Sequence, residues 1–218
     1  SLLREGGAEV ILQCARFYLS RAHRRVDGDK VELLDVIGPD EYHERVNNNA
    51  FTNQMAAHCM CCALKLCEAF ADEPDVMEQL IEKLAYQEDL ERLRTVAPKL
   101  RPAFAEGEVV EQFDGYFRLE DCSLDAVRSR VLDPREYWGT NHGVAAHTQI
   151  IKQADVIAMM ALFPALFSDE TVERNWRFYE PRTEHGSSLS ACMYALTACR
   201  IGRPDLAWEN FMKTAAID

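Results

Sequence analysis

Apolar residues recur at the three- and four-residue spacing of α-helices through most of this chain, and almost no stretch alternates as a strand does. The clearest helical stretches lie at residues 10–21, 51–70, 76–98, 124–131, 134–137, 147–167, 188–199 and 205–216. Residues 31–37 are the only candidate for a strand. The pattern predicts an all-α protein built from antiparallel helical hairpins. A helical toroid and an α-solenoid both satisfy it, and the lack of a repeat of fixed period counts against the solenoid.

The stretch at residues 147–167 differs from the other predicted helices because nearly all of its side chains are apolar, which predicts a buried helix. Lys152 and Asp155 lie within it, and buried charges need partners. Three residues apart on one helix, they could pair with each other as a purely structural bridge. A ligand-binding role for the polar residues 152–155 is the alternative.

Length and charge narrow the possible functions. The chain has 218 residues, enough for one sizeable domain, and a net charge of −12. A chain this acidic, without a basic run, is a poor candidate for binding nucleic acid or an anionic membrane surface. A phosphate-containing ligand would need a dedicated local pocket.

The expected location is the cytoplasm. The sequence shows neither a signal peptide at Ser1–Glu5 nor an apolar run long enough to span a bilayer. Its eight cysteines include one CxxC spacing, between Cys59 and Cys62, and no second one, so the paired spacing of common zinc sites is absent. We expect the cysteines to be reduced and to serve as small apolar side chains of the core, with no metal site.

A polar segment at residues 38–44 precedes one of the predicted helices. It contains Asp40, Glu41, Tyr42, His43 and Glu44, and several asparagines follow it. Side chains of this kind hold sugars, because each sugar hydroxyl both donates and accepts hydrogen bonds. A carboxyl crowded by other carboxylates can stay protonated and serve as the acid that glycosidic cleavage needs. The alternative is a polar loop that caps the next helix, with Asn49 at the cap.

A second polar segment, residues 180–190, offers a cradle for an anion. Gly186 lets the backbone approach a ligand closely, and His185 can add a charge or a hydrogen bond. Ser187 and Ser188 supply hydroxyls and amides at the start of a predicted helix, where the positive end of the helix dipole favours an anion. The alternative is a simple serine cap. No nucleophile elbow, phosphate-binding P-loop or dinucleotide-type glycine pattern competes with this prediction.

Four segments, in this order, resemble signatures of glycoside hydrolase family 65, which contains maltose, trehalose, kojibiose and nigerose phosphorylases. They are residues 36–44 (VIGPDEYHE), 112–117 (QFDGYF), 152–156 (KQADV) and 179–190. The resemblance extends over nearly the whole chain. It implies an (α/α)6 barrel whose site lies at one mouth, and it implies that residues 1–218 are the later part of a catalytic domain that belongs to a larger enzyme.

The resemblance also implies roles for particular residues. Glu41 matches the general acid, Lys152 and Gln153 match residues that hold the glucosyl unit, and His185–Ser188 match the phosphate site. Asp40, Tyr42 and His43 are expected to contact the sugar as well. The implied reaction is inverting phosphorolysis of an α-linked glucose disaccharide to β-glucose 1-phosphate and a released sugar. Phosphate is the co-substrate, no cofactor is expected, and a homodimer is usual among similar enzymes.

Two other functions remain open at this point. A hydrolase on the same scaffold would need a second carboxylate to activate water. A helical segment without turnover of its own is the other alternative. The identity of the disaccharide does not follow from the sequence.

Overall fold

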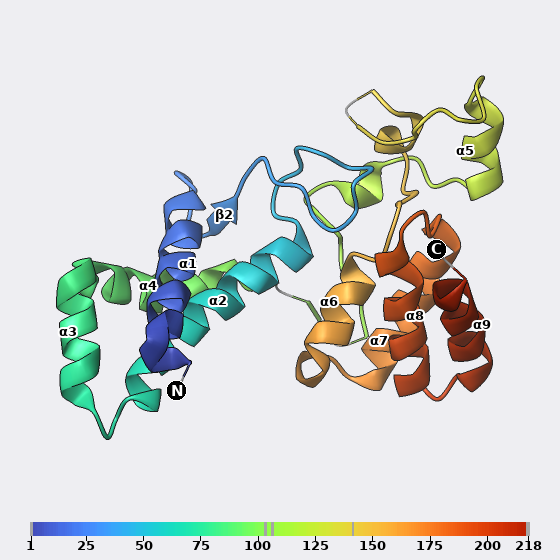
Figure 1. The fold of residues 1–218 in the computed structure, drawn as a ribbon. Coiled ribbons are helices and arrows are strands. Elements are labelled where there is room, and N and C mark those ends of the chain that lie inside the picture. Colours follow the sequence, from blue (N-terminus) through green and yellow to red (C-terminus); the bar gives the residue numbers. More distant parts are fainter. Residues whose placement is uncertain (1, 103, 106, 141, 217–218) are drawn as a thin grey trace. The chain divides into compact units, whose positions relative to one another are not determined.

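The computed structural model describes residues 2–102, 104–105, 107–140 and 142–216. Contacts divide the chain into two compact units, one formed by residues 1–34 and 52–102 and the other by residues 35–51 and 103–218. The α-helices are α1 (Ala8–Arg21), α2 (Ala50–Ala69), α3 (Pro74–Leu84), α4 (Gln87–Leu100), α5 (Leu124–Arg130), α6 (Val156–Leu162), α7 (Asp169–Tyr179), α8 (Ser188–Arg200) and α9 (Pro204–Ala215) (Figure 1). The predicted helical class is therefore confirmed.

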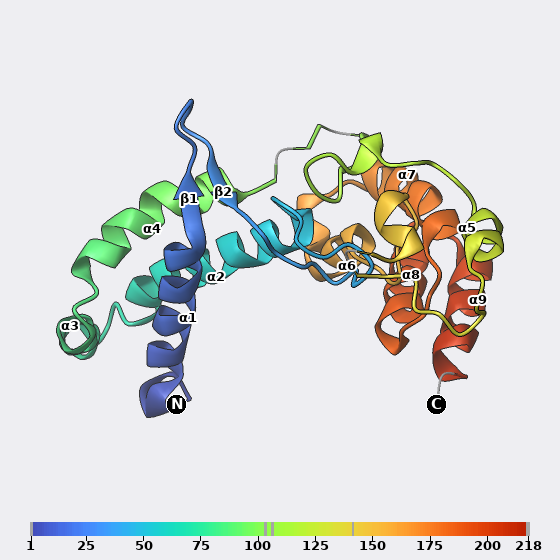
Figure 2. The same cartoon turned by 90° about the horizontal axis from the view of Figure 1, so that it is seen from above.

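The first unit contains the two described strands, β1 (Ala22–Arg24) and β2 (Val31–Leu33). They pair antiparallel, with Ala22 opposite Leu33 and Arg24 opposite Val31, and Figure 2 shows the hairpin that joins them. The strand predicted at residues 31–37 is thus shorter than expected. Its partner was missed, because three residues are too few for alternation to be visible in a sequence.

The predicted helix at residues 76–98 is wrong as one element, because the structure divides it into α3 and α4. Ala85 adopts a left-handed conformation at φ 48° and ends α3. Tyr86 follows fully buried, and its hydroxyl donates to the carbonyl of Leu12 at 2.6 Å. The break therefore lets an aromatic side chain anchor the α3–α4 turn to α1.

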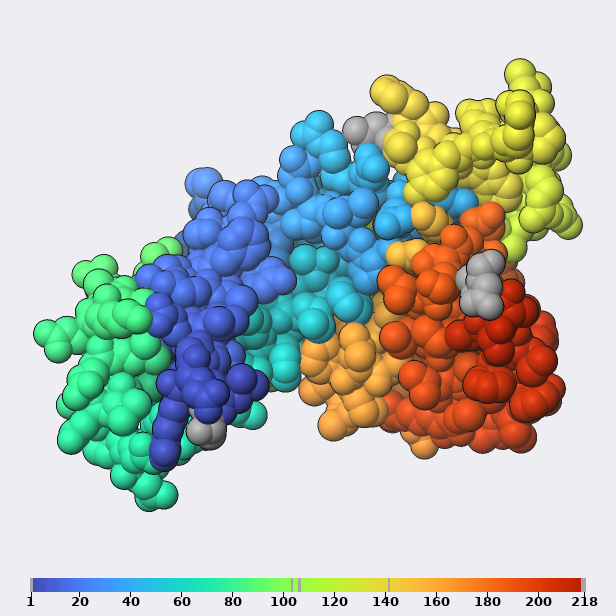
Figure 3. Space-filling view, viewed as in Figure 1, coloured from blue at the N-terminus to red at the C-terminus, as the bar shows by residue number. Residues whose placement is uncertain are grey.

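The second unit carries the core beneath the polar loops. Helices α8 and α9 form a hairpin whose turn uses Gly202 at φ 71°, and they lie side by side in Figure 3. Buried side chains from α6, α7, α8 and the loop at residues 110–116 form one apolar cluster. Its largest fully buried members include Tyr116, Tyr179 and Tyr194. Helix α7, absent from the predicted elements, completes this layer.

The long helix predicted at residues 147–167 is also wrong. The structure has a 3-10 turn at Val144–His147, an irregular segment through Asp155, helix α6 and another 3-10 turn at Pro164–Leu166. Most of residues 148–160 are buried as predicted, whereas Leu162 and Leu166 are exposed. The backbone bonds of this run go to distant segments, for example from Ile151 to the carbonyl of Arg182 at 2.9 Å. The helix predicted at residues 134–137 is likewise a turn.

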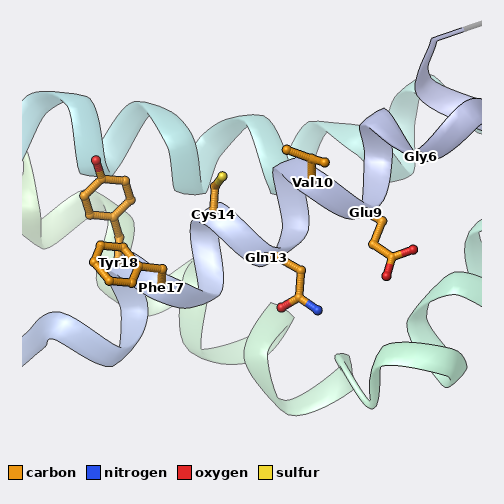
Figure 4. Close-up of a pocket in the computed structure, with 7 residues that line it drawn as sticks. All are labelled: Gly6, Glu9, Val10, Gln13, Cys14, Phe17 and Tyr18. Atoms are coloured by element: carbon orange, nitrogen blue, oxygen red, sulfur yellow. The ribbon is translucent and has the colours of Figure 1, made fainter.

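A groove of about 720 Å³ runs along the exposed face of α1 in the first unit, lined by Gly6, Glu9, Val10, Gln13, Cys14, Phe17 and Tyr18 (Figure 4). It contains none of the predicted site residues. Within the described ranges, no helix combines the length and the apolar character needed to cross a membrane. All eight cysteines are free thiols, but none of them is buried, so the prediction that they belong to the core is wrong.

Candidate active site

The loop at residues 38–43 is fixed by the buried carboxylate of Asp40, which is 1% exposed. One oxygen accepts the backbone N–H groups of Tyr42 at 3.1 Å and Lys152 at 2.9 Å. The other accepts from Gln112 Nε2 at 2.9 Å and contacts His43 Nδ1 at 2.6 Å. One side chain thus joins three segments that are distant in sequence, including both of those predicted to hold the sugar.

The ring of His43 is buried between two hydrogen-bond partners. Its Nε2 lies 2.9 Å from the carbonyl of Thr148, which can only accept, so Nε2 carries a proton. On the other side of the ring, Nδ1 lies 2.6 Å from Oδ2 of Asp40, which also accepts from Gln112 Nε2. Burial lowers the pKa of His43, but the hydrogen bond and charge of Asp40 outweigh it, and the pKa is raised. Asp40 and His43 therefore point into the protein, which suits positioning better than the predicted sugar contacts.

A second buried carboxyl, that of Asp155, lies next to the backbone of Asp40. It accepts from the side-chain amide of Asn49 at 3.0 and 3.2 Å and from the backbone N–H of Asp40 at 3.3 Å. Burial, followed by the negative charge of Asp40, raises the pKa of Asp155 to about 7. Gly38 leaves the space for this contact, because a Cβ there would collide with the side chains of Asn49 and Asp155.

The predicted bridge between Lys152 and Asp155 does not form. Lys152 instead pairs through its ammonium with the carboxylate of Glu41, and it lies 5.2 Å from the centre of the Tyr137 ring. The pKa of Lys152 is raised, chiefly by its hydrogen bond to Glu41. The Glu41 side chain is 50% exposed, which leaves its carboxyl accessible from solution.

The segment at residues 182–186 runs beside the Lys152 segment. Ile151 and Thr183 form a parallel bridge, and the N–H of Gly186 donates to the carbonyl of Lys152 at 3.0 Å. A Cβ on residue 186 would collide with Glu184 and lie 3.6 Å from the Lys152 Cγ. The predicted anion cradle therefore begins directly against the residue that contacts the predicted acid.

A hydrogen bond between side chains joins the two polar segments. The hydroxyl of Tyr42 donates to Glu184 Oε2 at 2.6 Å. Burial, together with this bond, raises the pKa of Tyr42. Gln153 adds a further link by donating its side-chain amide to the carbonyl of Pro39.

The residues of the predicted phosphate cradle differ in what they already contact. Ser187 is the N-cap of α8, and its hydroxyl accepts the N–H of Leu189 at 3.2 Å, so the capping alternative holds for this residue. Ser188 begins the helix and is exposed. His185 lies in a left-handed turn at φ 60°, and its Nδ1 is 3.0 Å from the hydroxyl of Ser190.

A pocket of about 620 Å³ opens beside this cluster. Three of the predicted site residues line it, namely Tyr42, Lys152 and Gly186, together with Glu184, Tyr137, Trp138 and the turn that follows α5. Aromatic faces beside hydrogen-bonding groups suit a sugar ring. Across the described residues, His, Cys, Asp and Glu form no group of three or more that could hold a metal ion.

Comparison with known proteins decides the family. The profile for the glycosyl hydrolase family 65 central catalytic domain matches residues 1–218. The chain belongs to glycosyl hydrolase family 65. It is 47% identical to a nigerose phosphorylase of Lachnoclostridium phytofermentans and 39% identical to a 1,2-alpha-glucosylglycerol phosphorylase of Bacillus selenitireducens. Each match covers 100% of this chain and 29% of the relative.

A solved structure agrees with this family 65 membership. It is provisionally named a kojibiose phosphorylase from the human microbiome, and its TM-score is 0.85 at 28% sequence identity. The match covers 96% of this chain and 27% of that one. The chain therefore spans less than a third of the length of these relatives. The predicted (α/α)6-barrel fold class is confirmed, and the solenoid alternative is excluded.

Several residues of the candidate site had no role in the sequence-based prediction. Glu184, Tyr137, Gln112 and Ser190 each contact a predicted site residue. Glu184, Gln112 and Ser190 lie in segments that match the family, which is a signal that could have identified them. Tyr137 lies in a turn, and no pattern in the sequence marks it.

Proposed function

We propose that the enzyme to which this chain belongs carries out inverting phosphorolysis of an α-linked glucose disaccharide. The observation that carries the proposal is the adjacency of an accessible carboxyl, Glu41, a cation, Lys152, and the turn at Gly186 beside a sugar-sized pocket. Relatives named as phosphorylases of nigerose and kojibiose support the same substrate class.

In the proposed reaction, Glu41 donates a proton to the oxygen that leaves with the second sugar. The bond between that oxygen and the anomeric carbon breaks, and a phosphate oxygen bonds to the anomeric carbon from the opposite face. The products are β-glucose 1-phosphate and the released sugar. Phosphate is already a nucleophile, so no second carboxylate is needed to activate water.

The pairing of Glu41 with Lys152 describes the site without substrate. To act as an acid, Glu41 must be protonated in the complex, whereas an ion pair holds it as a carboxylate. We therefore infer that substrate separates the pair. Phosphate near Gly186 would offer Lys152 a replacement anion, and the sugar oxygen would offer Glu41 its acceptor. Lys152 and Gln153 would then hold the glucosyl unit, and Asp40 and His43 would position the loop.

Product analysis with the full-length enzyme tests the proposal. Maltose, trehalose, kojibiose and nigerose are each incubated with and without inorganic phosphate, and the products are separated. We expect glucose 1-phosphate from one of them, only when phosphate is present. Free glucose at the same rate without phosphate would instead establish a hydrolase.

The role of Glu41 is tested by Glu41→Gln, which keeps the shape of the side chain and removes the proton that it donates. We expect kcat to fall by about 10²-fold or more, since acid catalysis contributes on that order. The matched control is Glu170→Gln at an exposed glutamate on α7, which should keep wild-type turnover. Near-wild-type turnover of Glu41→Gln would remove this residue from the role.

A further inference from the structure

The hydroxyl of Ser190 is fully buried on α8 and has two contacts with the site. It accepts the backbone N–H of Ala154 at 3.0 Å, and it lies 3.0 Å from His185 Nδ1. Ser190 thus connects the segment that carries Gln153 to the predicted phosphate cradle. Its own backbone N–H donates to the carbonyl of Ser187 at 3.1 Å, which fixes its place at the start of the helix.

These contacts determine where the hydroxyl proton goes. Because the oxygen already accepts from Ala154, its proton needs an acceptor, and within the described residues the partner in reach is His185 Nδ1. A donating Ser190 requires Nδ1 to be without a proton. The neutral ring then carries its proton on Nε2. The opposite tautomer would leave the buried Ser190 proton without an acceptor, which is unfavourable.

The Nε2 atom of His185 is itself buried and has no hydrogen-bond partner within the described part of the chain. A buried N–H without an acceptor is costly, and such groups often belong to binding sites. The ring is packed edge-on against Tyr194, with the ring centres 4.9 Å apart. Burial, followed by the charge of Lys213, lowers the pKa of His185 to about 4, while Glu209 acts in the opposite direction. The ring is therefore neutral near pH 7.

We propose that Ser190 is a positioning residue that fixes His185 in the tautomer with Nε2–H, so that His185 offers phosphate a neutral hydrogen-bond donor. The proposal rests on the proposed function, because phosphate is the acceptor assigned to Nε2. It assigns His185 a role that needs neither a positive charge nor proton transfer.

Two substitutions of His185 separate the two ring nitrogens in the full-length enzyme. The amide nitrogen of Gln reaches the position of Nε2, and that of Asn reaches the position of Nδ1. We expect His185→Gln to keep the phosphate KM within about 3-fold, and His185→Asn to raise it by about 10-fold, the value of one hydrogen bond. Asn suits the left-handed backbone at residue 185 better than Gln, so backbone strain predicts the opposite order. That opposite order would overturn the proposal.

Neutron diffraction from crystals of the full-length enzyme exchanged into D2O reads the tautomer directly. Deuterium on Nε2 of His185 and on the Ser190 oxygen is expected, and deuterium on Nδ1 alone would overturn the assignment.

Ser190→Ala should raise the phosphate KM by about 10-fold and change kcat less, as expected of a lost positioning contact. A fall in kcat with an unchanged phosphate KM would contradict the proposal. The neutron result is independent of turnover, so it remains decisive even if phosphorolysis is not observed.

Discussion

The residues of the candidate site differ in how firmly their contacts hold them in place. Asp40 joins the most segments, because its two oxygens hold the loop with Glu41, the backbone at Lys152 and the ring of His43. The Glu41 side chain by contrast is half exposed, and its carboxylate pairs with Lys152. The residue that is proposed to react is thus free to change partners, while the residue beside it is locked in place.

The buried carboxyl of Asp155 gives a prediction at this scale. Its folded-state pKa of about 7 exceeds its ordinary value of 3.8, so between these values the folded protein holds a proton that the unfolded chain releases. Its contribution to stability is therefore present below about pH 4 and is lost as the pH rises toward 7. Asp155→Asn should remove this loss, on the order of 1 kcal/mol per pH unit.

The measurement is calorimetric melting of the full-length enzyme and the Asp155→Asn variant between pH 4.5 and 7, with attention to the difference between the two curves. Subtracting the two curves removes the contribution of His185, which both proteins share. The pKa of His185 is lowered, mainly by burial, so its contribution to stability rises with pH over this range, whereas that of Asp155 falls. Asp133→Asn at an exposed turn is the control and should shift both ends of the range equally. Parallel curves for the wild type and Asp155→Asn would contradict the prediction.

At the scale of elements, α8 begins at the predicted phosphate cradle. Its cap is Ser187, and α7 has a comparable serine cap at Ser168, whose hydroxyl accepts the N–H of Thr171 at 3.2 Å. The two caps are alike in chemistry, but only the first lies beside Gly186. They therefore form a matched pair in which helix capping can be separated from ligand binding.

Ser187→Ala and Ser168→Ala should each lower the free energy of unfolding by about 1 kcal/mol, the usual value of a serine cap. Of the two substitutions, only Ser187→Ala should also weaken phosphate binding, because it removes a hydroxyl from the proposed cradle. Denaturant unfolding and the phosphate KM of the full-length enzyme give the two readouts. An equal phosphate KM in both variants would leave Ser187 with a capping role alone.

Element boundaries also show how far sequence reasoning reaches. Helices α1, α2, α5, α8 and α9 were predicted because their apolar spacing and their Gly or Pro boundaries agree. The prediction failed at residues 147–155, where a buried apolar run is compatible with a helix but its backbone bonds to Arg182, Glu120 and other distant residues. The segments of the site were likewise found from their motifs. Contacts such as that between Tyr42 and Glu184, 142 residues apart, depend on tertiary packing and leave no local pattern.

At the scale of the molecule, the site is assembled within one of the two compact units, from segments around residues 41, 152 and 186. Because phosphate would bind the folded state only, it should stabilise the full-length enzyme, by about 2.7 kcal/mol at a hundred times its Kd. Thermal melting with and without phosphate, at constant ionic strength, measures this.

A glycine pair tests whether that stabilisation comes from the cradle. Gly186→Ala places a Cβ against Glu184 and beside Lys152, so phosphate should no longer raise the melting temperature. Gly28→Ala is the control, because a Cβ at that exposed turn meets only the Lys30 nitrogen at 4.0 Å, and the phosphate effect should persist. A full phosphate effect in Gly186→Ala would place the anion elsewhere.

The short parallel bridge between Ile151 and Thr183 restricts where residues can be inserted or deleted during evolution. Side chains on paired extended segments alternate in direction, so deleting one residue next to Ile151 would turn Lys152 away from Glu41 and put an apolar group in its place. The loop at residues 132–137 is exposed throughout, and none of the described bridges involves it. Insertions there could reshape the rim of the pocket, and hence the choice of sugar, while the distance from proton donor to anion stays the same.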